Sequence, residues 1–159
     1  MTQENRFFRI LVAVDGSTSS LLATDYAISI ATKNNSQLII LYVIDAYRYT
    51  HLSSSIILAP TFGSEKYLEE KSEAEKLMNK IKEKSKLKIN DSTKSKELKT
   101  EIVEGVKSVA ATIMEYAELE DVNLIIIGSR GRTSFKKLLL GSVSSDVMKN
   151  AHCAVMVVR

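Results

Sequence analysis

The feature that most constrains the fold is a run of apolar, largely β-branched residues at positions 37–44, with hardly a polar interruption. A strand with one face in water alternates apolar and polar residues, so an unbroken apolar run predicts a strand covered on both faces. Shorter runs at 8–14 and 124–127 have the same character. Strands of this kind are typical of parallel sheets that carry helices on both faces.

Segments with helical periodicity separate these strands. Apolar residues recur at helical spacing over residues 22–31, 67–81, 106–117 and 143–148. Two further strands are expected at 98–103 and 154–158, whereas residues 45–63 read as a long loop or partly ordered lid and 90–96 as a polar connection. Five strands thus alternate with four helices, which predicts an α/β fold with an open, largely parallel sheet and right-handed crossovers.

Composition limits the classes of protein. A chain of 159 residues, 45% hydrophobic, is expected to form one domain over residues 1–159. Its net charge is only +3, and the lysines between 66 and 99 are interleaved with glutamates, so we expect a solvated helix face and no nucleic-acid partner. The single cysteine, Cys153, cannot form an internal disulfide, and no apolar run reaches the ~20 residues of a membrane span. We therefore expect a cytoplasmic protein without leader or membrane segment.

The strongest functional pattern follows the apolar run at 124–127. Gly128 and Gly131 are three residues apart, and Gly141 and Ser142 come after nine more residues, where a helix is expected to begin. Glycines let a backbone approach a ligand closely, and the first turn of a helix presents unpaired N–H groups at the positive end of its dipole. The pattern favours a phosphate site, although glycines that merely turn the chain and a serine that merely caps a helix also explain it. Hydroxyl and basic side chains nearby are Ser142, Ser144, Ser145, Arg130, Arg132, Lys136 and Lys137.

Two other glycine-rich signatures do not fit. A P-loop needs a lysine directly after its last glycine, and neither Gly131 nor Gly141 has one. The dinucleotide fingerprint needs a Gly-x-Gly, which occurs nowhere in the chain.

In open parallel sheets, ligands lie at the carboxyl ends of strands where the strand order reverses. Asp15 ends the first expected strand and Gly128 the fourth, so these residues face each other if the two strands are neighbours. A carboxylate there can accept hydrogen bonds from ribose hydroxyls or help hold a cation. A turn or capping role for Asp15 fits the composition equally well.

Taken together, these residues resemble the universal stress proteins, within the Rossmann-like, adenine nucleotide α-hydrolase-like fold. The resemblance rests on residues 10–17, on Gly128-x2-Gly131-x9-Gly141-Ser142, and on the last apolar run at 155–158. It implies strand order 3-2-1-4-5, ATP as ligand with Mg or Mn beside its phosphates, and a homodimer. The dimer would form by antiparallel pairing of the last strands, through Val155 and Val157.

The resemblance also implies roles for individual residues. Asp15 would contact the ribose, the backbone of Val43 the adenine, and Ala13 would line the base pocket. The other nucleotide-binding residues it implies are Val14, Gly128, Ser129, Arg130, Gly131, Gly141, Ser142, Val143 and Ser144. The chain departs from many family members, which have proline in place of Ala13 and Cys-Pro in place of Cys153-Ala154.

The expected function is that of an adenine-nucleotide-binding regulatory or sensor protein of the stress response. Two alternatives stay open: a slow ATP hydrolase or autokinase, and a nucleotide-free protein-interaction module, against which the intact glycine loop argues. The two histidines, His51 and His152, lie outside the glycine pattern, so no catalytic residue is assigned. An unidentified protein partner fits both the regulatory protein and the interaction module.

Overall fold

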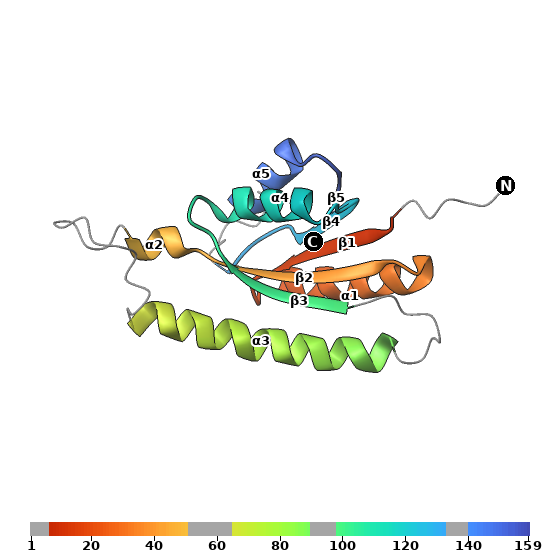
Figure 1. Ribbon diagram of the computed structural model, residues 1–159, viewed down its shortest axis with the longest axis horizontal. Helices are drawn as coiled ribbons and strands as arrows, with labels where there is room; N and C mark the ends of the chain where they lie inside the picture. The colour runs from red at the N-terminus through yellow and green to blue at the C-terminus, as the bar shows by residue number, and fades with distance from the viewer. Residues whose placement is uncertain (1–6, 51–64, 90–97, 133–139) are drawn as a thin grey trace.

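The computed structural model describes residues 7–50, 65–89, 98–132 and 140–159. These contain an open parallel sheet in the order β3-β2-β1-β4-β5, which confirms the expected topology (Figure 1). Its strands are β1 (Arg9–Val14), β2 (Gln37–Ile44), β3 (Leu98–Glu104), β4 (Leu124–Gly128) and β5 (Ala154–Val158). The chain runs outward from β1 to β3 and then crosses back to β4, so the order reverses between β1 and β4.

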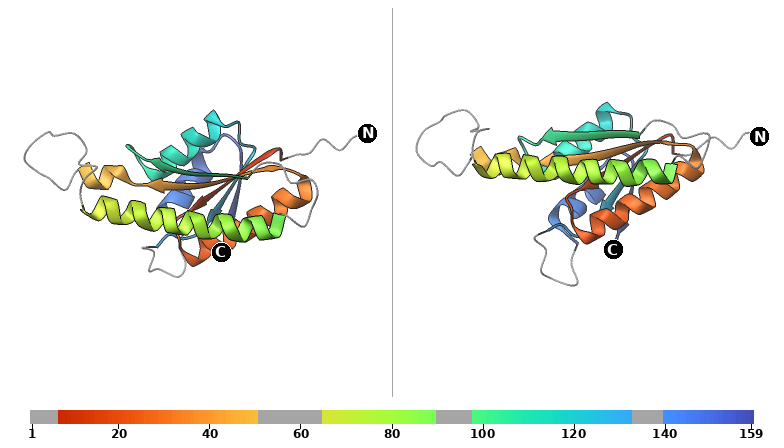
Figure 2. Two further views of the ribbon diagram at one scale, coloured as in Figure 1. Left: turned by 60° about the horizontal axis from the view of Figure 1, so that its bottom comes forward. Right: turned by 90° about the horizontal axis from the view of Figure 1, so that it is seen from below.

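Helices cover both faces of this sheet. They are α1 (Thr18–Asn34), α2 (Ala46–Thr50), α3 (Glu65–Ile89), α4 (Val109–Leu119) and α5 (Ser142–Asn150). α1 and α3 pack on one face, where Figure 2 shows them side by side, and α4 and α5 pack on the other. A 2.9 Å ion pair between Lys84 of α3 and Asp25 of α1 joins the first two at the surface.

The central strands supply side chains to two separate cores. In β1, Ile10 and Val12 point toward α1 and α3, whereas Leu11 and Ala13 point toward α4 and α5. Successive side chains of a strand point to opposite faces, and both faces here are covered, so every position must be apolar. This is the physical reason for the unbroken apolar runs.

Local signals set the ends of several helices. Ser17 caps α1 by accepting a hydrogen bond from the Ser20 amide, and Asn35 ends the helix in the left-handed conformation, with φ of 52°. The helix expected over 106–117 begins later, at Val109, because Ser108 caps it by accepting from the Ala111 amide at 3.1 Å. Val106 consequently lies outside the helix and is 67% exposed.

Two other expectations need correction. The irregular segment 45–63 opens with α2, a helix too short to show periodicity, so the structure adds a helix to the four expected. Met148, one of the apolar residues whose spacing predicts the helix at 143–148, is 47% exposed, whereas Val147 is buried. Residues 51–63, with His51, and the connection at 90–96 lie outside the described residues. No helix in the described ranges combines the length and apolarity needed to cross a membrane.

Candidate functional site

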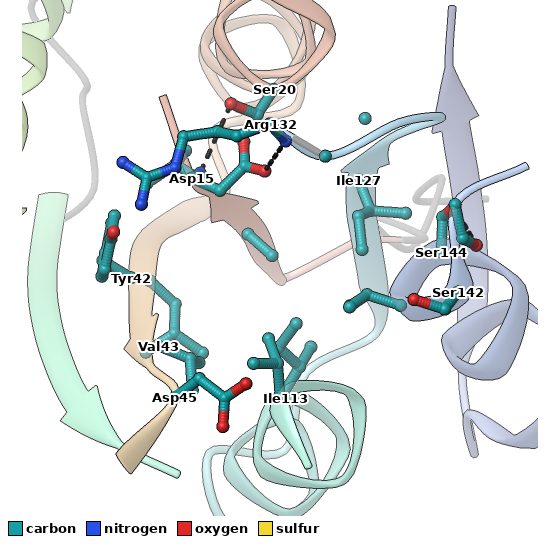
Figure 3. Close-up of a pocket in the computed structure, with 18 of the residues that line it drawn as sticks. Asp15, Ser20, Tyr42, Val43, Asp45, Ile113, Ile127, Arg132, Ser142 and Ser144 are labelled. Carbon is teal, nitrogen blue, oxygen red and sulfur yellow. Dashed lines mark hydrogen bonds between the residues drawn. The ribbon is translucent and has the colours of Figure 1, made fainter. Parts of the chain in front are cut away.

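A cavity of about 260 Å³ opens at the carboxyl ends of β1, β2 and β4, where the strand order reverses (Figure 3). Of the residues expected in a nucleotide site, all but Ser129 line it. These residues come from three strand ends, the glycine loop and the start of α5, segments that are far apart in the chain. The fold therefore brings the predicted set together around one space.

One wall of the cavity is apolar. Ala13 and Val43, each one residue before the end of its strand, line an apolar slot together with Ile113 of α4 and Ile127 of β4, and Figure 3 shows Val43, Ile113 and Ile127 around this space. Ile113 was expected only as a core residue, since the periodicity of α4 does not indicate that its inner face also reaches the cavity. A slot of this kind suits a flat aromatic ligand, which gains free energy when its faces leave water.

Asp15 joins the two loops that border the cavity. One carboxylate oxygen accepts a hydrogen bond from the Ser17 amide at 2.9 Å, and the other accepts from the Arg132 amide at 3.2 Å. The first bond is the turn role that the sequence left open, and the second ties Asp15 to the glycine loop. A carboxylate has about four acceptor positions, so both oxygens keep the capacity to accept from a ligand.

Hydroxyl groups of α1 hold the glycine loop in place. The carbonyl oxygen of Arg130 accepts from the Ser19 hydroxyl at 2.7 Å and from the Ser17 hydroxyl at 3.1 Å. Neither serine was among the residues expected in the site. Nothing in the local pattern shows that residues more than 100 positions apart meet, so this role had no detectable signal.

Ser129 and Ser144 brace the start of α5 from inside. Both are buried, at 4% and 2% exposed. The Ser144 hydroxyl donates to the Ser129 carbonyl at 3.1 Å, and that carbonyl also accepts from the Gly141 amide at 2.8 Å. The Ser144 side chain and the Ser129 carbonyl thus bind protein groups, whereas the Ser142 side chain is exposed at the cavity rim.

The first turn of α5 has the build of an anion site. Gly141 is its N-cap in an extended conformation and has no side chain to satisfy the first amides. The amides of residues 142–144 have no partner inside an α-helix, and the positive end of the dipole lies there. Backbone donors therefore point out of α5 beside the glycine loop.

The three glycines of the loop differ in how much space the structure leaves for a side chain. A Cβ on Gly128 would lie 2.6 Å from the Ser19 hydroxyl and 2.7 Å from the Ser20 amide, so close packing of β4 on α1 requires it. A Cβ on Gly131 would lie 3.0 Å from an Asp15 carboxylate oxygen. A Cβ on Gly141 would meet its neighbours at 3.5 Å, which is ordinary contact, so the fold itself leaves room for a side chain there.

An acidic and aromatic margin borders the cavity on the side of α3. Glu70 lines the cavity and accepts a hydrogen bond from the Tyr42 hydroxyl at 3.4 Å and another from Tyr49. Burial raises the pKa of Tyr42 to about 12, with Arg132 opposing this rise and Glu70 adding to it, so the phenol stays protonated at neutral pH. Sequence reasoning missed this margin because Glu70 is one of many charged residues on a helix with no distinguishing pattern.

Within the described ranges, no group of three or more His, Cys, Asp or Glu side chains is placed to hold a metal ion. His152 lies just before the amino end of β5, whereas the cavity lies at the carboxyl ends of the strands, and its Nδ1 is 3.9 Å from Glu118 Oε1. Cys153 is half-buried, and burial raises the pKa of its thiol. Neither residue belongs to the cavity.

The order of the strands, the glycine loop and the cavity at the switch point define a doubly wound α/β protein with a small-ligand site. The model of the universal stress protein family matches residues 6–159, and the chain belongs to this family. Universal stress protein MJ0531 of Methanocaldococcus jannaschii is 37% identical over 98% of this chain and 84% of its own length.

Solved structures agree with this assignment. The universal stress protein UspA from Lactobacillus plantarum superposes with a TM-score of 0.78 at 30% identity, over 97% of this chain and 99% of its own. A universal stress protein family member from Arabidopsis thaliana, solved with AMP bound, shares the fold with a TM-score of 0.63 at 20% identity, over 94% of this chain and 90% of its own.

The two glycines with different surroundings give a test of this geometry. Gly128→Ala should lower the free energy of unfolding by about 2 kcal/mol, because its Cβ would overlap backbone and hydroxyl atoms of α1. Gly141→Ala should change it by less than about 0.5 kcal/mol, because the added methyl group has room. Urea unfolding followed by circular dichroism measures both; equal stability of the two variants would show that β4 does not pack this closely on α1.

Proposed function

We propose that this universal stress protein binds an adenine nucleotide, ATP with a divalent cation, in the cavity between β1, β2 and β4, and that it acts as a nucleotide-dependent regulator. The observation that carries the proposal is the meeting of three features around one cavity: an apolar slot, the Asp15 carboxylate and the uncapped start of α5 beside the glycine loop. In a nucleotide, the aromatic base needs an apolar slot, the ribose needs a hydrogen-bond acceptor such as a carboxylate, and the phosphates need backbone donors such as those at the start of a helix. The AMP bound to the Arabidopsis protein of the same fold supports this reading.

The base fits the slot between Val43 and Ile113. β1 pairs with β2 only as far as Tyr42, whereas β2 continues to Ile44, so the last backbone groups of β2 have no β1 residue opposite them. Hydrogen bonds from these groups to the edge of adenine would account for the role assigned to the backbone of Val43. Asp15 would accept from the ribose hydroxyls with its remaining lone pairs.

The phosphates fit the amides at Gly131 and at the first turn of α5. Several donors and a helix dipole favour a polyphosphate over a neutral ligand. The described residues contain no cluster that would bind a cation without the nucleotide. Mg or Mn would accordingly be held mainly by phosphate oxygens and water, with Asp15 as the carboxylate within the site.

The carboxylates of the cavity favour binding over rapid turnover. Asp15 accepts two backbone hydrogen bonds, Asp45 lies 3.5 Å from the Arg48 guanidinium, and Glu70 accepts from two tyrosines. A general base has to be aimed at the water that it deprotonates; these carboxylates are held by donors of the protein, and the remaining acceptor capacity of Asp15 is assigned to the ribose. A protein that holds ATP longer than it hydrolyses it is suited to report nucleotide state.

Affinity for ATP tests the proposal. Asp15→Asn should weaken ATP binding by about tenfold, because it replaces a charge-assisted hydrogen bond to ribose or cation with a neutral one. The exposed residue Asp146 on α5 provides a control with the same loss of charge, and Asp146→Asn should bind ATP as the wild type does. Isothermal titration calorimetry with Mg-ATP measures both. Wild-type affinity in Asp15→Asn, or no binding by the wild type, would refute the assignment of the site.

The same family resemblance leads us to propose a homodimer through β5. This strand is an edge of the sheet, and Val155 and Val157 along it are only half-buried. An exposed apolar edge invites pairing with another strand.

Val155→Lys should convert the dimer to a monomer, because a charge at the strand edge opposes pairing. Met148→Lys, on the exposed side of α5, should leave the dimer intact. Light scattering coupled to gel filtration distinguishes the two; a monomeric wild type, or a dimeric Val155→Lys variant, would contradict pairing through β5.

A further inference from the structure

Arg132 connects the cavity with α3. Its amide donates to Asp15 at 3.2 Å, which fixes the backbone at the cavity margin. Its guanidinium, labelled beside Asp15 in Figure 3, extends toward α3, with Nη2 3.9 Å from Glu70 Oε1 and Nη1 3.5 Å from Glu73 Oε2. A single cation therefore reaches both the glycine loop and two carboxylates of a helix on the other side of the margin.

The two carboxylates differ in how firmly they are held. The Glu70 side chain is 16% exposed and accepts hydrogen bonds from Tyr42 and Tyr49, so its position at the cavity wall is fixed. The Glu73 side chain is 66% exposed and reaches Arg132 from the surface. Glu70 is thus a fixed partner for the guanidinium at the cavity margin, and Glu73 is an exposed partner at the surface.

The contacts of Arg132 with α3 are suited to exchange. At 3.5 and 3.9 Å they are longer than charge-assisted hydrogen bonds, and the Arg132 side chain is 49% exposed, so solvent screens them. A phosphate offers the planar guanidinium two acceptor oxygens at shorter range and carries more charge than a carboxylate. A nucleotide in the cavity would therefore compete for this side chain.

We propose that Arg132 exchanges Glu70 and Glu73 of α3 for the phosphates of the bound nucleotide. This makes Arg132 a phosphate-binding residue in addition to those assigned above, and it makes the link between the glycine loop and α3 depend on nucleotide occupancy. The inference rests on the proposed nucleotide site. It gives that site a physical route to the long exposed helix α3.

A double-mutant cycle on ATP affinity tests the exchange. The four proteins are the wild type, Glu70→Gln, Arg132→Gln and the double variant, and each is titrated with Mg-ATP in a calorimeter. Gln at position 70 removes the charge with little change in shape; it keeps one acceptor oxygen, so one of the two tyrosine hydroxyls has to accept from the new amide group instead of donating. Direct repulsion between Glu70 and a phosphate is present in both backgrounds and cancels in the cycle, so the cycle isolates the partner change of Arg132.

If Arg132 leaves Glu70 on binding, Glu70→Gln should strengthen ATP binding more in the presence of Arg132 than in its absence, by about threefold, the size of an exposed ion pair. Glu69→Gln, a neighbouring exposed position on α3, should show no such dependence on Arg132. A second cycle with Glu73→Gln should give a dependence of the same sign, and it covers the case in which the Glu70 variant is poorly folded.

Equal effects of Glu70→Gln in the two backgrounds, or a larger effect without Arg132, would show that the ion pair survives in the complex and would overturn the exchange while leaving the nucleotide site intact. Failure of the wild type to bind ATP would overturn the nucleotide site and the exchange together.

Discussion

The site depends on how closely the end of β4 packs against the first turn of α1. Gly128 allows this approach because it has no Cβ, and the hydroxyls of Ser17 and Ser19 then reach the carbonyl of Arg130. An unpaired carbonyl at this position would repel a phosphate; here its lone pairs are occupied by α1. The glycine loop is thereby fixed between Asp15 on one side and the start of α5 on the other, and the cavity takes its shape from this arrangement.

Much of the fold could be predicted because its signals are local. Doubly buried strands need unbroken apolar runs, and the runs at 37–44 and 154–158 match β2 and β5 in both bounds. Ser17 caps the beginning of α1 and Asn35 its end, both through hydrogen bonds to residues only a few positions away. α2 escaped prediction because five residues make little more than one helical turn, and the start of α4 was misplaced because Val106 continues the apolar spacing beyond the Ser108 cap.

The candidate site was predictable in its residues and less so in their roles. The glycine spacing and the strand ends indicated the right place, since parallel strands end at one edge of the sheet. The sequence could not show that Gly128 serves the packing of α1 or that the Ser144 hydroxyl binds a carbonyl, because both facts depend on neighbours distant in the chain. Glu70 could not be predicted as a cavity residue because nothing in the sequence distinguishes it from the other charged residues of α3.

The cavity is lined by side chains of both charges. Asp15, Asp45 and Glu70 bring negative charge to a cavity whose expected ligand is itself anionic, and Arg48, Arg130 and Arg132 offset it. The acidic side chains lower the affinity of the cavity for phosphates, and a bound cation that offsets their charge would raise it. Family membership fixes the fold, and the proposed response to a nucleotide would act through the arrangement of these charges.

The most direct test of this account is to map ATP binding onto the protein by the backbone amide chemical shifts of the isotope-labelled chain. The account predicts saturable changes that are largest at residues 128–131 and 141–144 and at the carboxyl end of β2. Saturable changes centred on another surface, or no change with Mg-ATP at millimolar concentration, would contradict the central claim that the cavity at the switch point of the sheet binds a nucleotide.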